Sequence, residues 1–170
     1  MRIGRRKLML VDLEWYEYDM AASVGLNRKV QSLLNGHRDL HNVKFTPITD
    51  VGWSVVSAVA EYAAAKALNK SWDGAVNTFS RPDLPNIEIK SQQHHTIDEY
   101  KKRNFLFLRK DCDDDLNHLL VLIHSHLRYE LAGYITGAEA KQEKFYYGVK
   151  GRPSGYGVPI DDLHKDFESL

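Results

Sequence analysis

The chain has 170 residues, a length typical of one domain with its own hydrophobic core. Cys112 is its only cysteine, which excludes an intrachain disulfide and argues against a disulfide-stapled secreted protein. The 23 basic and 23 acidic side chains cancel, which argues against a protein that coats nucleic acid non-specifically.

The charges are unevenly distributed along the chain. Residues 1–110 hold 17 Lys and Arg against 12 Asp and Glu, whereas residues 111–170 hold 6 against 11. The first two thirds could therefore contact a polyanion, and an ordinary solvated surface with a chance asymmetry explains the counts about as well.

No segment has the pattern of a signal peptide or a membrane span. The apolar stretch at residues 8–11 is too short for a signal peptide, and the apolar run at 119–123 has the length of a strand. We expect a soluble, cytoplasmic protein without a membrane partner.

Two helices are predicted in the first part of the chain. Apolar residues at spacings of three and four predict a helix over residues 13–34, with Gly36 as its stop and a polar loop over 36–47. An alanine-rich second helix is predicted over 51–68, capped by Thr49 or Asp50. Glu61 lies in its middle, and its neighbours three and four positions away are small, so it would lie where another element approaches closely.

Short strands dominate the rest of the chain. Turn residues at 69–74 and two prolines within 81–86 precede the first strand. Branched and aromatic residues predict strands at residues 87–91, 105–109, 118–126 and 128–136, a short helix at 137–144, and a last strand around 155–160. This order predicts a single mixed α/β domain, with an N-terminal helical part over about 1–48 and a core over about 49–170.

In one predicted strand, two charged residues alternate with two isoleucines, a pattern that would suit a catalytic strand. Because side chains two apart share a face, Glu88 and Lys90 point one way, and Ile87 and Ile89 point into the core. Asp83 lies just before the strand. Two or three carboxylates are the usual protein ligands of Mg²⁺, and a hard cation promotes attack of water on a phosphodiester.

The acid-x-lysine pattern occurs three times, and its context separates the three copies. Glu139 and Lys141 lie in a helical stretch, where residues two apart do not face each other, and Glu99 and Lys101 lie in a charged segment without a preceding Asp strand. Only residues 88–90 combine apolar alternation, an upstream Pro-Asp and an earlier helical glutamate. A surface Glu/Lys pair on an edge strand is the alternative.

The segments around this strand resemble the PD-(D/E)xK nuclease superfamily, in detail a group of uncharacterised phage-encoded members. The resemblance is carried by AVAEYAAAKAL at 58–68, Trp72, residues 76–79, Pro82-Asp83, IEIKS at 87–91, AGYITGAEAK at 132–141 and YGVPIDDL at 156–163, and it includes residues 14–28. It implies a restriction-endonuclease-like mixed sheet flanked by helices, with an extra N-terminal helix. It also implies Mg²⁺-dependent cleavage of DNA, with Mn²⁺ as a substitute.

The resemblance also implies roles for individual residues. Asp83 and Glu88 would be metal ligands together with the backbone carbonyl of Ile89, Lys90 would be the catalytic lysine, and Glu61 would complete the metal shell. One departure is the short spacing between Asp83 and Glu88, which requires a very tight hairpin. If Asp83 does not reach, Asp73 is the substitute.

Several polar residues near this strand are further candidates for a functional role. Gln92 is a candidate supporting residue, and Lys101, Lys102 and Arg103 are candidate contacts for the DNA backbone or ordinary solvated residues. His94, His95, His124 and His126 lack the spacing of a zinc site, so we expect structural histidines.

Three functions remain open from the sequence. The first is a DNA nuclease, the second a catalytically inactive protein of the same fold that binds DNA or a host protein, and the third a phage-encoded modulator of a host enzyme. A homodimer is one expectation, because many enzymes that cut both DNA strands are dimers, although no dimer surface is legible in the sequence.

Overall fold

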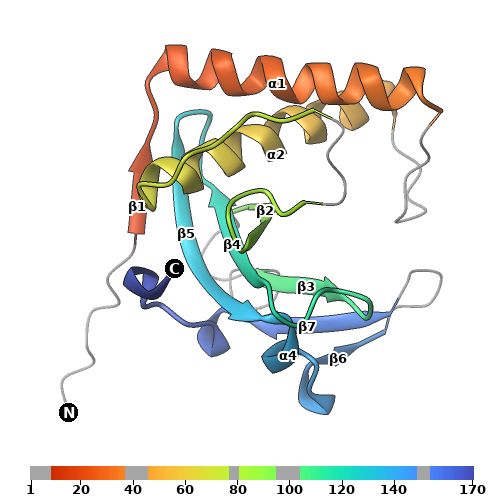
Figure 1. Cartoon of the computed structure of the whole chain (residues 1–170), viewed down its shortest axis with the longest axis vertical. Coiled ribbons are helices and arrows are strands. Elements are labelled where there is room, and N and C mark those ends of the chain that lie inside the picture. Colours follow the sequence, from red (N-terminus) through yellow and green to blue (C-terminus); the bar gives the residue numbers. More distant parts are fainter. Residues whose placement is uncertain (1–8, 37–45, 77–80, 95–103, 149–153) are drawn as a thin grey trace.

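The computed structural model describes residues 9–36, 46–76, 81–94, 104–148 and 154–170. Its fold is mixed α/β, as predicted, and its two long helices lie together on one side of the strands (Figure 1). The elements are β1 (Met9–Asp12), α1 (Trp15–Leu34), α2 (Pro47–Ala67), β2 (Ile87–Gln93), β3 (Phe105–Arg109), β4 (Asn117–Ile123), β5 (Arg128–Thr136), α4 (Gly137–Ala140), η1 (Glu143–Phe145), β6 (Tyr146–Tyr147), β7 (Gly155–Pro159), η2 (Ile160–Asp162) and η3 (Phe167–Ser169).

The strands form two sheets. The larger has the order β1-β5-β4-β2, in which β2 and β4 are parallel and the other pairs are antiparallel. The smaller is antiparallel, with the order β3-β7-β6. Because β2 and β4 are parallel, the carboxyl ends of both strands lie at the same end of the larger sheet.

Strand β4 explains how the layers pack. Leu119 and Val121 belong to a core under the helices, whereas Leu120 and Leu122 belong to a second core with β3 and β7. Successive strand residues point to opposite faces, so an uninterrupted apolar run is buried on both sides. Within the described residues, helices therefore cover one face of the larger sheet, and the small sheet covers the other face. The sequence had predicted a sheet flanked by helices.

Helix α1 lies over α2 and contacts it through small residues. Ala21 and Gly25 are buried, while several of the apolar residues that predicted the helix are exposed: Trp15, Met20, Val30, Leu33 and Leu34. The predicted helix is confirmed, and Ala21 and Gly25, rather than those large apolar residues, form part of its buried face. A close helix pair needs small residues at the crossing, because these let the backbones approach.

Gly25 tests this packing directly. A Cβ atom at Gly25 would lie 2.6 Å from the Ser54 carbonyl oxygen and 2.7 Å from Val55 Cα, both backbone atoms. We expect Gly25→Ala to lower the free energy of unfolding by about 1–3 kcal/mol in urea denaturation, because α1 must move away from α2. The matched control is Gly52→Ala in α2, where a Cβ would meet nothing within 4 Å. It should instead stabilise by about 0.5–1 kcal/mol, and equal effects of the two changes would contradict the close packing.

Several element boundaries differ from the prediction. Thr46, rather than Thr49 or Asp50, caps α2, and its side chain accepts a hydrogen bond from the Thr49 amide. Strand β4 ends at Ile123 and α4 at Ala140, both earlier than predicted. Strand β1 was not predicted, and it comes from the part of the chain that was expected to be helical.

No helix in the described part of the chain combines the length and apolar character needed to cross a membrane.

Candidate functional site

A two-residue turn joins Asp83 to strand β2. Leu84 and Ile87 exchange two backbone hydrogen bonds of 3.0 and 2.9 Å around Pro85 and Asn86. Asn86 has a φ of 61°, which asparagine tolerates better than most residues, and proline suits the preceding turn position. The short spacing is therefore accommodated by a tight hairpin, as the sequence required.

This turn places the Asp83 carboxylate beside β2. Its Oδ2 atom accepts a 2.7 Å hydrogen bond from the Ile89 amide. The substitute residue, Asp73, has other partners, because its carboxylate accepts hydrogen bonds from the Ala75 amide and the Arg81 guanidinium. The hydrogen bond to Ile89 shows that Asp83 reaches β2, so the substitution by Asp73 is not needed.

Glu88 and Lys90 lie on the same face of β2. Ile87 and Ile89 are buried in the core, and the Lys90 ammonium donates a 2.8 Å hydrogen bond to Glu88 Oε1. In the other described triplet, Glu139 accepts hydrogen bonds from Thr136, while Lys141 binds Asp114. The predicted alternation of β2 and the difference between the two triplets are confirmed.

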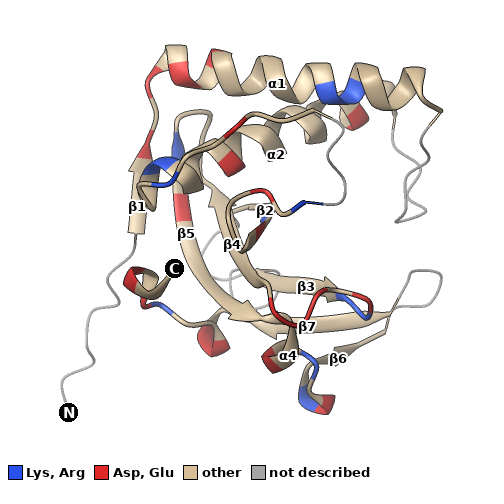
Figure 2. Cartoon of the chain, in the orientation of Figure 1, with Lys and Arg blue, Asp and Glu red and all other residues tan. Residues whose placement is uncertain are grey.

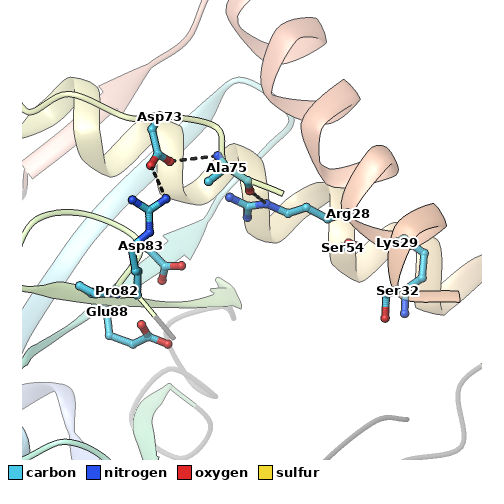
Figure 3. A pocket seen from close by; sticks show the side chains of 10 residues that line it. Arg28, Lys29, Ser32, Ser54, Asp73, Ala75, Pro82, Asp83 and Glu88 are labelled. Carbon is cyan, nitrogen blue, oxygen red and sulfur yellow. Dashed lines mark hydrogen bonds and ion pairs between the residues drawn. The ribbon is translucent and has the colours of Figure 1, made fainter. Parts of the chain in front are cut away.

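Asp83 and Glu88 line an open pocket of about 330 Å³ between the β2 hairpin and the two long helices. Figure 3 shows their carboxylates beside each other on one side of the pocket, with Arg28 reaching towards them from α1. The other lining residues are Lys29, Ser32, Ser54, Asp73, Ala75, Arg81 and Pro82. Basic residues of α1 and acidic residues of the hairpin thus line one pocket. Figure 2 marks the basic positions of α1 in blue and the acidic positions of the chain in red.

Glu61 is buried behind the pocket and holds Arg28. Arg28 Nη1 donates to both carboxylate oxygens of Glu61, at 2.7 and 2.8 Å, and the Trp72 indole donates a third hydrogen bond at 3.2 Å. Arg28 Nε also donates to the Ala75 carbonyl at 2.7 Å. The guanidinium is therefore fixed by two segments of the chain, and charge-assisted hydrogen bonds of this kind are the strong ones.

A local sequence pattern pointed to Glu61, but none pointed to Arg28. The small neighbours Ala58, Ala64 and Ala65 are buried, which agrees with the predicted close approach at that face of α2. Arg28 lies 33 positions away in the chain from the carboxylate that binds it, and one helical arginine carries no local pattern. The available signal was the need of a buried carboxylate for a cationic partner.

The pKa of Asp83 is raised to about 7. Burial is the largest cause, followed by the negative charges of Glu61 and Glu88, while the Ile89 amide and Lys90 act in the opposite direction. Carboxylates that share a site disfavour each other's ionisation, and a bound cation would remove this penalty. The arrangement is suited to a positive ligand.

The raised pKa predicts a stability that depends on pH. At pH values below 3.8 the Asp83 carboxyl is protonated in both the folded and the unfolded chain, and from there to about pH 7 only the unfolded chain loses the proton. The free energy of unfolding therefore falls over this range. We expect Asp83→Asn, which cannot ionise, to become progressively more stable than the wild type up to about pH 7 and to keep that margin above it. Urea denaturation in EDTA at several pH values measures it, and a margin independent of pH would contradict the assignment.

The remaining predicted residues lie in different places. Gln92 lies on β2, and its Oε1 atom is buried without a hydrogen-bond partner in the described structure. Lys101, Lys102 and Arg103 fall outside the described residues, as does His95. His94 and His124 are stacked on each other beyond the ends of β2 and β4, at a distance of 4.0 Å between ring centres.

Comparisons with known proteins do not assign the chain to a family. No family model matches it, and neither the curated proteins nor the solved structures contain a match. The resemblance to PD-(D/E)xK nucleases stays a prediction.

Proposed function

We propose that the protein is a Mg²⁺-dependent nuclease that hydrolyses phosphodiester bonds of DNA, and that its fold is restriction-endonuclease-like. The observation that carries this proposal is the placement of the Asp83 and Glu88 carboxylates in one pocket, with the Lys90 ammonium 2.8 Å from Glu88 and Arg28 across from them. Two acids and a lysine on one strand and its turn are the parts that such chemistry requires.

The oxygen atoms of the hairpin fit a hard cation. Asp83 Oδ1 and Glu88 Oε2 accept no hydrogen bond from a described residue, so both could bind a metal ion. The Ile89 amide points towards Asp83, and the carbonyl of a strand residue points to the same edge as its amide. These three oxygens could therefore serve as ligands, in keeping with the preference of Mg²⁺ for a few protein oxygens and several waters, and Mn²⁺ could substitute.

Glu61 suits a positioning role better than the direct metal contact that the sequence suggested. Both of its oxygens accept hydrogen bonds from Arg28, and Oε2 accepts another from Trp72, so most of the acceptor positions of Glu61 are already filled. Glu61 would instead orient the guanidinium group of Arg28 towards the phosphate. Its negative charge still raises the pKa of Asp83 and so favours a cation there.

The residues of the candidate site would each contribute to hydrolysis in a different way. The chemistry that Mg²⁺ supplies when bound is neutralisation of charge on the phosphate oxygens and a lower pKa for the attacking water. Lys90 would orient that water, help to deprotonate it or stabilise the charge that develops in the transition state. Arg28, Lys29 and Arg81, which line the same pocket, offer positive charge to the phosphates on either side.

The architecture supports the restriction-endonuclease-like proposal in part. A mixed sheet carries the acid-x-lysine strand at its edge, and helix α2 packs on one face of that sheet and contributes Glu61. The small antiparallel sheet on the other face would be an addition to the flanking helices that the resemblance implies. Binding of the DNA backbone by Lys101, Lys102 and Arg103 stays a prediction.

A homodimer fits one further feature. The outer side of α1 exposes several large apolar side chains: Trp15, Tyr16, Met20, Leu26, Val30, Leu33 and Leu34. Contiguous exposed apolar residues commonly mark a contact surface. Enzymes that cut both strands of a duplex often use two copies of the site.

A plasmid-nicking assay tests the proposed function. We expect supercoiled plasmid to be converted to nicked or linear DNA with Mg²⁺ or Mn²⁺, and to stay intact with EDTA. Single-stranded DNA and RNA offered in parallel would identify the substrate class. Failure of the wild-type protein to bind either metal and to cut any of these substrates would favour the catalytically inactive alternative, which binds DNA or a host protein.

A further inference from the structure

We propose that His94, His124 and Glu130 form a second metal site, which is selective for a transition metal such as Zn²⁺ and separate from the proposed Mg²⁺ site. Each residue offers one ligand atom, and these atoms all lie within 4.8 Å of one another. Two imidazoles and one carboxylate are a ligand set that suits Zn²⁺ and that Mg²⁺ disfavours.

The topology of the larger sheet brings the three residues together. His94 follows β2 directly and His124 follows β4 directly, and these strands are parallel and in register through Gln93 and Ile123. The His94 amide donates a 3.0 Å hydrogen bond to the Ile123 carbonyl, which continues the pairing past the strand ends. Glu130 lies on β5 opposite Leu122 and reaches His124 from the neighbouring strand.

The distances require only small movements to bind an ion. His124 Nε2 lies 2.8 Å from Glu130 Oε2, and the two histidine rings are stacked with their centres 4.0 Å apart. Tetrahedral Zn²⁺ with bonds of about 2.0–2.1 Å places its ligand atoms roughly 3.4 Å apart. The three ligand atoms, which lie within 4.8 Å of one another, would therefore have to move closer, and one imidazole would have to rotate out of the stack for both rings to bind the same ion.

Burial supplies the physical reason for a cation at this place. Glu130 is only 3 % exposed, and a buried carboxylate is costly unless a positive partner compensates its charge. Its described partner is His124, which carries a positive charge only when protonated. Both histidines protonated in one stack would repel each other, whereas a single metal ion can bind both rings in their neutral form.

The cluster is accessible and distinct from the first site. His124 also lines a pocket of about 660 Å³ formed with residues such as Tyr18, Trp53 and Tyr129, which gives an ion a route of entry. Six strand positions separate Glu88 from His94, roughly 20 Å along β2 at about 3.3 Å per residue. This separation excludes a two-metal catalytic pair, whose ions lie about 3.5–4 Å apart.

The test is a calorimetric Zn²⁺ titration and a Co²⁺ absorption spectrum. The starting protein carries Asp83→Asn and Glu88→Gln, so that the proposed Mg²⁺ site does not contribute. We expect one bound Zn²⁺ and intense tetrahedral Co²⁺ bands. His94→Gln and His124→Gln, each added separately, should weaken Zn²⁺ binding by about 10²-fold or more, since even the loss of an outer partner of a ligand costs 10–100-fold.

The matched control is His164→Gln. His164 also lies beside a glutamate, 3.1 Å from Glu139, but among the described residues this pair belongs to no group of three His, Cys, Asp or Glu ligand atoms. This change should leave Zn²⁺ affinity unaltered. Unaltered affinity in both His94→Gln and His124→Gln would overturn the proposal. If those variants do not fold, the Co²⁺ spectrum of the starting protein decides, and a weak octahedral spectrum would overturn the proposal. Each result is independent of DNA cleavage, so failure here leaves the nuclease proposal standing.

Discussion

Replacement of Glu88 by glutamine should abolish metal-dependent cleavage. The change preserves the size of the side chain and removes the charge that lies beside Asp83 in the pocket and 2.8 Å from Lys90. A hard cation has few other ligands here, so we expect Mn²⁺ binding at this site to be lost in calorimetry. Loss of several kcal/mol of metal-derived stabilisation corresponds to a fall of about 10³-fold or more in the single-turnover rate.

The chain supplies a matched control for this experiment. Glu139→Gln is the same change in the other described Glu-x-Lys triplet, where the glutamate caps α4 and does not contact its lysine. We expect metal binding and cleavage of this variant to equal those of the wild type. Cleavage by Glu88→Gln at the rate of the control would remove Glu88 from the mechanism. Glu88→Gln should also lower the pKa of Asp83, because it removes a neighbouring negative charge.

Replacement of Lys90 by alanine should separate catalysis from binding. If Lys90 acts on the water or on the transition state, its loss should lower the single-turnover rate by about 10²-fold or more while DNA and metal still bind. Metal affinity should be retained or increased, because the alanine removes a positive charge that competes for Glu88. Calorimetric Mn²⁺ titration and single-turnover cleavage, both on the same protein sample, measure the two effects.

Lys141→Ala is the matched control for the lysine. Its ammonium binds Asp114 and the Cys112 carbonyl, away from the pocket, so cleavage should be unaffected. A wild-type cleavage rate in Lys90→Ala would show that Lys90 is a structural partner of Glu88. A simultaneous loss of metal binding and cleavage would instead assign it to maintaining the shape of the hairpin.

Local sequence patterns predicted those parts of the fold that depend on neighbouring residues. The alternation of isoleucine with charged residues in β2 and the aromatic and branched run of β3 gave the correct strands. Strand β1 could not be predicted in this way, because a short apolar run becomes a strand only when a partner such as β5 is available. The buried face of α1 could not be read from local patterns, because its contact with α2 depends on Ala21 and Gly25, which carry little hydrophobic signal.

In the candidate site, too, contacts between residues close in sequence could be predicted, and contacts that depend on the packing of distant segments could not. Asp83, Glu88 and Lys90 are close in sequence, and a turn and one strand suffice to bring them together. The contact of Glu61 with Arg28 depends on how two helices cross, which no local pattern encodes. The cluster of His94, His124 and Glu130 could not be found from sequence spacing, because its members follow β2, follow β4 and lie on β5, and they come together only when β2 and β4 pair in parallel.

The pairing of β1 with β5 has a consequence for the order of folding. Asp12 and Arg128 form an ion pair across these strands although 116 positions separate them in the chain. Contacts between such distant segments are slow to form, because a long loop must close before the pairing contributes stability. On the ribosome, β1 must therefore wait until β5 has emerged, while α1 and α2 can already pack against each other. Completion of the larger sheet should therefore be a late event in synthesis.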